Sequence, residues 1–244
     1  MSEQIGENFQ DGTRTVACAA LINSFCTACF HRAYPQGVGM GRYDITGAQG
    51  SIQSGSDDGV LANRLNITRS EDMDEAELVL LQKLYVSVLH EHLPPGRISV
   101  LHLKRWHKRW LGNVYEWAGQ YRSVNMSKDG FPFAPAAQLP RLMHMFDTDY
   151  LARYTPCTDM TFSDLVSAIA VVHVEFILMH PFREGNGRLS RLLADVMAVQ
   201  SGREPLDYTS WEQNKVSYVT AIQSGMGCDY EPMKRWVGQA LEMP

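Results

Sequence analysis

The sequence predicts a mainly α-helical fold with one small β-hairpin. Three observations support this prediction: apolar residues recur at helical spacing in about seven or eight segments after residue 60, turn residues close those segments, and one short segment alternates between apolar and polar residues. The chain has 244 residues, of which 45% are hydrophobic, so it can bury a substantial core in one large domain.

The first 59 residues differ in composition from the rest of the chain. Residues 14–33 are predicted to form a largely apolar helix, and residues 35–59, rich in Gly, Ser, Gln and Asp, an irregular arm. Cys26 and Cys29 have the spacing of metal ligands, but no second such pair exists, so we interpret them as small apolar helix residues. We therefore divide the chain into an N-terminal extension of unknown role, residues 1–59, and a main domain, residues 60–244.

Two helices are expected at the start of the main domain. The first begins at Ser70, a candidate N-cap followed by acidic residues, and runs to about His92, before Pro94-Pro95-Gly96. The second covers residues 101–111, where basic and aromatic residues alternate. We interpret it as a helix with a solvated basic face and a buried tryptophan face, in preference to a nucleic-acid patch.

A hairpin and a series of helices follow. Residues 121–126 alternate and predict a short strand, Asp129-Gly130 predicts a turn, and Phe131-Pro132-Phe133 leaves that turn. The later helices are predicted at residues 139–154, 162–179, 188–200, 211–222 and 231–241.

The stretch from His180 to Arg188, with the sequence HPFREGNGR, concentrates polar chemistry between two predicted helices. A Gly-Asn-Gly turn that opens onto a helix suits a phosphate, because glycines let the backbone come close and N–H groups point outward. Glu184 could hold a hard cation, Mg²⁺ by preference, between phosphate oxygens. His180 is the natural base for a hydroxyl proton.

This stretch resembles the signature of the Fic family, His-x-Phe-x-[Asp/Glu]-Gly-Asn-Gly-Arg, at every signature position, and Arg191 matches a second arginine found in many members. Residues 114–119 resemble the family's Tyr-x-Trp-Ala-Gly segment, and residues 122–133 resemble its substrate-binding flap hairpin. The resemblance extends from about residue 60 to about residue 240. It implies a Fic-type helical bundle that transfers AMP from ATP to a Ser, Thr or Tyr hydroxyl of a target protein.

The resemblance also implies a role for each signature residue. His180 would take the proton of the attacking hydroxyl, Glu184 would hold Mg²⁺ against the α- and β-phosphates, and Phe182 would anchor the loop in the core. Gly185, Asn186 and Gly187 would form the anion hole, with the side chain of Asn186 also contacting the α-phosphate. Arg188 would hold the β-phosphate and Arg191 the γ-phosphate. The full set of expected nucleotide-binding residues is Gly185, Asn186, Gly187, Arg188 and Arg191.

For several further residues, a structural interpretation stands beside the functional one. In the flap, Lys128, Gly130 and Phe131 are candidates for target binding, although Lys128 could equally be a solvated turn residue. Asn214 and Tyr218 lie where family members contact adenine, and ordinary packing explains them equally well. We interpret His173, about two helical turns before the signature histidine, as a core residue.

The signature also bears on the branch of the family. Glu184 and Gly187 favour AMP transfer over the γ-phosphate transfer of the branch that resembles the phage toxin Doc. The family's inhibitory motif, [Ser/Thr]-x-x-x-Glu-[Gly/Asn], is not evident: Glu7-Asn8 lacks the spaced serine, and Ser87 to Glu91 is followed by His92. We therefore expect a separate small antitoxin protein to supply a glutamate beside Arg191.

Composition narrows the class of protein. The net charge of −5 argues against direct binding of nucleic acid, and no apolar run reaches the roughly 20 residues that a membrane span needs. The odd number of cysteines, five, and the lack of a basic leader favour a cytoplasmic protein. A topoisomerase subunit is the first candidate target, because toxins of the family modify such subunits. An inactive Fic-like scaffold, and a variant that transfers another phosphate-containing group, stay open as alternatives.

Overall fold

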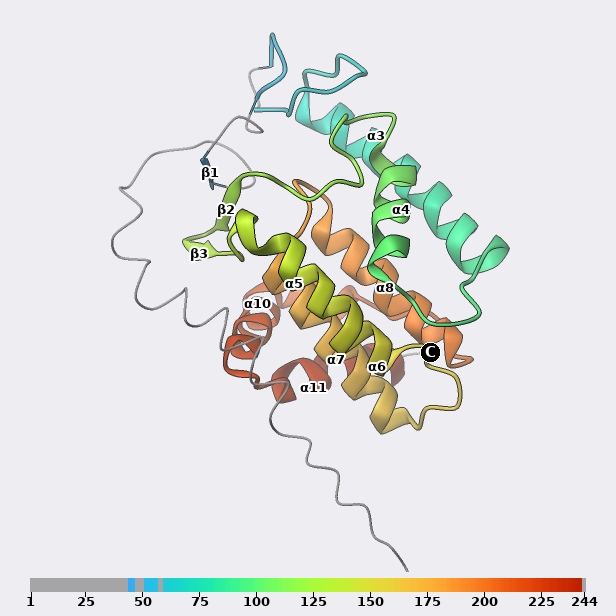
Figure 1. Ribbon diagram of the computed structural model, residues 1–244. Coiled ribbons are helices and arrows are strands. Elements are labelled where there is room, and N and C mark those ends of the chain that lie inside the picture. Colours follow the sequence, from blue (N-terminus) through green and yellow to red (C-terminus); the bar gives the residue numbers. More distant parts are fainter. Residues whose placement is uncertain (1–43, 47–50, 57–58, 243–244) are drawn as a thin grey trace, which may run out of the picture.

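The computed structural model describes residues 44–46, 51–56 and 59–242, and within them the protein is mainly helical, as predicted (Figure 1). The helix predicted at residues 14–33, with Cys26 and Cys29, lies outside the described residues. The helices are α3 (Ser70–Val86), α4 (Val100–Leu111), α5 (Leu139–Met145), α6 (Ala152–Tyr154), α7 (Phe162–Met179), α8 (Asn186–Gln200), α9 (Thr209–Gln213), α10 (Lys215–Ser224) and α11 (Glu231–Glu242). The strands are β1 (Asp44–Thr46), β2 (Asn125–Lys128) and β3 (Phe131–Pro132).

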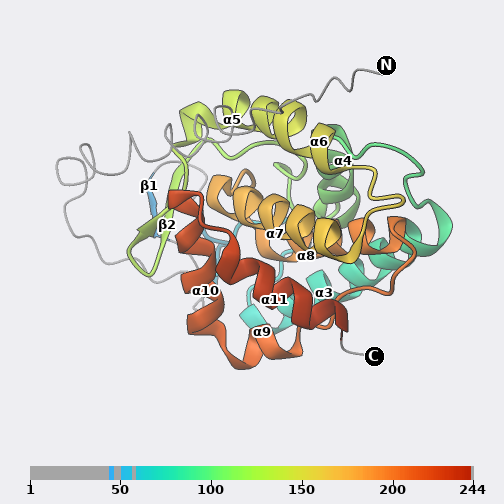
Figure 2. The same cartoon turned by 90° about the horizontal axis from the view of Figure 1, so that it is seen from below.

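The helix α7 forms the centre of the core. It packs against α8 and α11, and α5, α6 and α10 complete its surroundings (Figure 2). It starts at Thr161, whose hydroxyl accepts a hydrogen bond from the N–H of Asp164, and it covers the predicted range. Among the helices in the described ranges, α7 alone has the length and hydropathy to cross a membrane, and 78% of it is buried inside the protein. A position at the centre of a core explains this apolar composition.

The two early helices, α3 and α4, lie side by side and cover one flank of α8. The helix α3 continues through a π-helical turn, Ser87–Glu91, and stops before Pro94, as predicted. The N-cap prediction was wrong: Arg69 has the extended conformation of an N-cap, and Ser70 is already the first helical residue. The helix α4 buries its tryptophans, as the interpretation of its two faces required.

The hairpin carries a third strand. Its strands β2 and β3 pair antiparallel, with Lys128 opposite Phe131, and the two turn residues both have positive φ, 51° at Asp129 and 75° at Gly130. The strand β1 pairs antiparallel with the outer edge of β2, within the region expected to be an irregular arm. The strand predicted at residues 121–126 begins only at Asn125, because the side chain of Arg122 turns into the core.

Two other helix boundaries differ from the prediction. The helix α8 begins at Asn186, two residues early, because Gly185 takes a left-handed conformation that serves as its N-cap. The helix predicted at residues 211–222 is interrupted at Asn214, whose backbone leaves the helical region with φ of −118° and ψ of 43° and whose N–H and side-chain amide share the carbonyl of Ser210. The segment at residues 139–154 is helical throughout but contains a π-helical stretch, Phe146–Leu151.

Candidate active site

The signature loop joins the end of α7 to the start of α8. His180 ends α7 in a left-handed conformation, with φ of 49°. Phe182 is fully buried and stacks on the ring of His107 with a centroid distance of 4.1 Å, which anchors the loop in the core as expected. The side chain of Asn186 closes the loop, because its Oδ1 accepts from the N–H of Phe182 at 2.8 Å and its Nδ2 donates to the carbonyl of Phe182 at 2.7 Å.

The two glycines of the loop have different surroundings. Gly185 has φ of 80°, and a Cβ atom there would come within 2.6 Å of the ring of Trp110. Around Gly187 a Cβ atom would meet nothing within 4 Å. The first N–H groups of α8 have no partner inside the helix, and its N-cap residue, Gly185, has no side chain that could cap them. The open space beside Gly187 thus gives an anion access to the N-terminus of α8.

The ring of His180 is buried and neutral. Its Nδ1 lies 3.2 Å from the carbonyl of Ile177, which can only accept, so Nδ1 carries the proton and Nε2 keeps the lone pair. Burial lowers the pKa of His180 to about 3, and the nearby charges of Arg122 and Lys128 act in the same direction. Phe133, which directly follows β3, stacks on the ring at 3.7 Å. A neutral imidazole in this tautomer can take a proton at Nε2.

Glu184 folds back onto the start of α8. Its Oε1 accepts a hydrogen bond from the N–H of Gly185 at 2.9 Å and lies 3.4 Å from Nη2 of Arg188. The described residues contain no cluster of three or more metal-binding side chains. A single carboxylate, that of Glu184, still fits Mg²⁺, because proteins commonly hold this ion through one or two carboxylates while substrate phosphates and water complete its coordination shell.

The two arginines of the site have different partners. Arg188 pairs with Glu77 of α3 at 2.5 Å, and its guanidinium lies 4.6 Å from the centroid of the Trp110 ring. Arg191 pairs with Glu212 of α9 at 2.8 Å, where the glutamate side chain is 66% exposed. Ser87 and Glu91, which have the spacing of the inhibitory motif, contact Arg109 and His92 instead.

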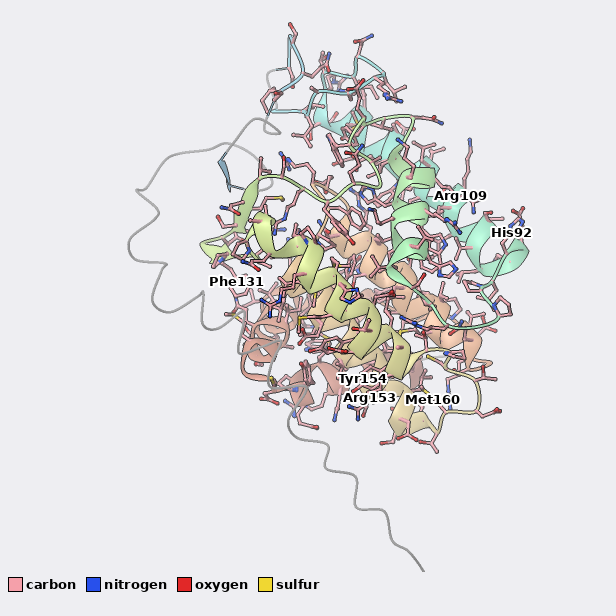
Figure 3. All side chains as sticks on the ribbon, in the orientation of Figure 1. His92, Arg109, Phe131, Arg153, Tyr154 and Met160 are labelled. Carbon is pink, nitrogen blue, oxygen red and sulfur yellow. The ribbon has the colours of Figure 1, made fainter. Side chains whose placement is uncertain are left out.

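The flap approaches the loop through residues that the sequence reasoning missed. Figure 3 shows Phe131 at the hairpin, on the opposite side of the molecule from Arg109 and His92. Phe131, Lys128 and Gly130 form the end of the hairpin, whereas Phe133 contacts His180. Only the position of Phe133 within the hairpin could have indicated this contact.

Arg122 joins the flap to the signature loop. It is 2% exposed and donates to the carbonyls of His180, Val124, Ala134 and Met179. His107 makes a second brace, since its Nδ1 accepts from the N–H of Gly119 and its Nε2 therefore donates to the carbonyl of Glu184 at 3.1 Å. Burial lowers the pKa of His107 to about 4, so this brace is neutral. Neither brace was predicted: Arg122 lies at the start of the recognised flap segment and His107 in the predicted helix at residues 101–111, and nothing else in the sequence marks them.

The expected adenine-contacting residues lie on the flank formed by α9 and α10. The hydroxyl of Tyr218 lies 2.8 Å from Nε2 of His173, and its ring stacks on Trp211 at 5.0 Å. His173 also bonds Ser190 of α8 at 2.6 Å and is buried, as expected of a core residue. Asn214 is exposed at the junction of the two helices. These contacts give Tyr218 a packing role, and a contact with adenine stays a prediction for both residues.

Comparisons with known proteins point to one family. A family model described as the Fic/DOC family matches residues 97–198. The probable protein adenylyltransferase y4lH of Sinorhizobium fredii is 28% identical over 174 residues, which cover 71% of this chain and 87% of that protein. The probable protein adenylyltransferase Fic of Escherichia coli is 25% identical over 68% of this chain and 80% of its own length. The protein adenylyltransferase VbhT of Bartonella schoenbuchensis is 30% identical, but the match covers only 30% of its length.

Solved structures show the same fold. The BepC protein of Bartonella tribocorum, solved with bound AMPPNP, superposes with a TM-score of 0.63 and 21% identity over 78% of this chain and 94% of that chain. The N-terminal Fic domain of an effector from Bartonella sp. AR 15-3 superposes with a TM-score of 0.66 and 20% identity over 86% and 94%.

Proposed function

We propose, from the premise that this chain belongs to the Fic/DOC family, that it transfers AMP from ATP to a hydroxyl group of a target protein. One observation carries the proposal: a single loop contains both a buried, neutral His180 whose Nε2 keeps its lone pair and the N-terminus of α8, with open space beside Gly187. A base and an anion-binding site in one loop are what the attack of a hydroxyl on a phosphate requires.

The reaction follows from these positions. The target hydroxyl loses its proton to Nε2 of His180 while its oxygen forms a bond to the α-phosphorus. The bond from that phosphorus to the oxygen bridging the α- and β-phosphates breaks, and pyrophosphate leaves. Backbone N–H groups at the start of α8 stabilise the charge on the phosphate oxygens. The side chain of Asn186 fixes the shape of this cradle, since both of its polar atoms bind Phe182.

The two arginines and a metal ion would neutralise the remaining negative charges of the triphosphate. Arg188 holds the β-phosphate and Arg191 the γ-phosphate. Glu184 would hold Mg²⁺, which neutralises charge on the phosphates when bound. In this structure Oε1 of Glu184 accepts a hydrogen bond from the N–H of Gly185. To hold the metal, the carboxylate would turn away from that N–H.

The flap determines the approach of the target. Phe133 covers the ring of His180, which is 4% exposed, so a target hydroxyl reaches Nε2 only after Phe133 moves or packs against the target instead. Lys128, Gly130 and Phe131 form the end of the hairpin and bind the target segment. A bacterial topoisomerase subunit is the first target to test.

Labelled ATP tests the proposed reaction. With a topoisomerase subunit or a cell lysate, label from the α-phosphate should appear on a protein band, and His180→Ala should reduce it by about 10²-fold to 10⁴-fold. Binding of ATP should be retained in that variant, because the phosphate cradle is intact. Label that appears only from the γ-phosphate would make the protein a kinase, and no label from either position would favour an inactive scaffold.

We also propose that the protein is cytoplasmic and that a small antitoxin protein inhibits its activity there. The partner of Arg191, Glu212, is mostly exposed, and such a pair contributes little free energy. A glutamate from a small antitoxin protein can therefore replace Glu212 and block the γ-phosphate position. Co-expression with the product of a neighbouring gene should yield a stable complex without activity. A fully active chain that does not harm the cell when expressed alone would contradict this part.

A further inference from the structure

Glu77 is a buried carboxylate whose two oxygens both have a defined partner. It lies on the buried face of α3 with Met73 and Leu84, and only 1% of it is exposed. Its Oε2 accepts from Nη2 of Arg188 at 2.5 Å, and its Oε1 accepts from the hydroxyl of Tyr115 at 2.8 Å. The carboxylate is therefore fixed in orientation as well as in place.

The guanidinium of Arg188 is held by three separate segments. Glu77 contacts it from α3, the Trp110 ring from α4 at 4.6 Å, and Oε1 of Glu184 from the signature loop at 3.4 Å. Within the described part of the chain, all of its hydrogen bonds run through Nη2. The remaining N–H groups of its planar fork can therefore bind an anion.

The pair differs from an ordinary ion pair of the core. A carboxylate as buried as that of Glu77 requires a cation beside it. Here that cation is Arg188, whose side chain is 29% exposed, so the pair joins a buried anion to a partly exposed cation. The backbone of Glu77 is fixed too, since its carbonyl accepts from Nε1 of Trp110 at 2.8 Å. One residue of α3 thus fixes the guanidinium through its side chain and the aromatic ring through its backbone carbonyl.

Arg191 provides the contrast within the same molecule. It projects from α8 one turn later, and its carboxylate partner, Glu212, is 66% exposed. A weak surface pair of this kind allows a side chain to move. The two arginines therefore differ in how far the protein orients them before a ligand binds.

We propose that Glu77, supported by Tyr115, is a positioning residue that orients Arg188 toward the β-phosphate of the nucleotide. The inference rests on the proposed function, because that function gives Arg188 its phosphate. A pre-oriented arginine loses less conformational freedom on binding, so the benefit appears only with ligands that carry a β-phosphate.

A comparison of ADP with AMP isolates the effect. Equilibrium binding of both nucleotides to the full chain, without added metal, should show that Glu77→Gln weakens ADP binding about tenfold and changes AMP binding less than about twofold. Arg188→Ala should cause a similar loss, and the double variant should lose little more, because both changes remove one interaction.

The chain offers a matched control in Glu175. It too is a fully buried glutamate that accepts from a tyrosine hydroxyl, that of Tyr230 at 2.5 Å, but it belongs to α7 and does not contact Arg188. Glu175→Gln should leave both nucleotide affinities unchanged. An equal loss in this control, or an equal loss of ADP and AMP binding in Glu77→Gln, would show a general structural role and overturn the inference.

Two further measurements separate this inference from the proposed function. Tyr115→Phe keeps the charge pair, so it should fold even where Glu77→Gln does not, and it should weaken ADP binding about threefold. Modification by phenylglyoxal, followed by peptide mapping, should be several times faster at Arg188 in Glu77→Gln and unchanged at Arg191. If Glu77→Gln left the reactivity of Arg188 unchanged, the inference would be overturned, even if the variant bound nucleotide normally.

If the wild-type chain bound no nucleotide, the proposed function would fail. Faster modification of Arg188 in Glu77→Gln would still show that Glu77 fixes Arg188.

Discussion

At the scale of single residues, the site depends on buried polar groups with defined protonation states. Burial lowers the pKa values of His180 and His107, so the proposed base and the histidine that braces the loop are both neutral. Because the pKa of His180 is lowered to about 3, its protonation should not limit the rate near neutral pH. The rate of AMP transfer should therefore show no loss attributable to this histidine between pH 8 and about pH 5. An acidic limb centred near pH 6.5 that His180 variants remove would contradict this assignment.

The glycines of the signature provide a second test at this scale. Gly185→Ala should lower the free energy of unfolding by about 2 kcal/mol or more, because the residue has a positive φ and its Cβ would meet the ring of Trp110 at 2.6 Å. Gly187→Ala should leave stability nearly unchanged but weaken nucleotide binding, because the new methyl group enters the open anion position. Urea unfolding and ADP binding measure the two effects. Equal loss of stability in both variants would contradict the distinction.

At the scale of elements, the buried guanidinium of Arg122 holds the flap against the end of α7. Arg122→Lys should lower the free energy of unfolding by about 3 kcal/mol, because one ammonium group cannot reach the separate carbonyls that the guanidinium binds. Hydrogen exchange should speed up in β2 and β3. Arg109→Lys is the control: this arginine is exposed, and its side chain donates a hydrogen bond to Ser87. A similar loss in the control would rule out a clamp specific to Arg122.

Elements with a strong apolar period were predictable, and elements shaped by tertiary contacts were not. The pattern predicted α7 over its full range because almost every side chain on it enters the core. It missed the break at Asn214, where a side chain competes for a backbone carbonyl, and it missed β1, which exists only through pairing with β2. Those features depend on partners far away in the sequence or on side-chain choices that no period records.

At the scale of the whole molecule, stability should depend on pH through the carboxyl of Glu175. Burial raises its pKa to about 7, well above that in an unfolded chain. The folded state therefore binds the proton more tightly, and the stability present below about pH 4.5 is lost as the pH rises to about 7. Glu175→Gln should remove this loss and raise the free energy of unfolding at pH 8 by about 2 to 3 kcal/mol. Urea midpoints at pH 5 and pH 8 measure it, and a variant less stable at pH 8 would contradict the assignment.

The candidate site was predictable where it is continuous in sequence and not where the fold assembles it. Nine consecutive residues indicated the base, the anion loop and an arginine. The partners that hold them, Glu77, His107, Arg122 and Phe133, come from three other segments and have ordinary local surroundings in the sequence. Only packing brings them to the loop.

The junction of α7 and α8 has one more consequence. Each helix carries a macrodipole equivalent to about half an elementary charge at its ends, positive at the N-terminus and negative at the C-terminus. His180 ends α7, and the proposed phosphate cradle begins α8, so the two opposite poles lie in one loop. In the proposed reaction the imidazole would become positive beside the negative pole, while negative charge would grow on phosphate oxygens beside the positive pole. The backbone alone thus favours the charge separation of the transition state.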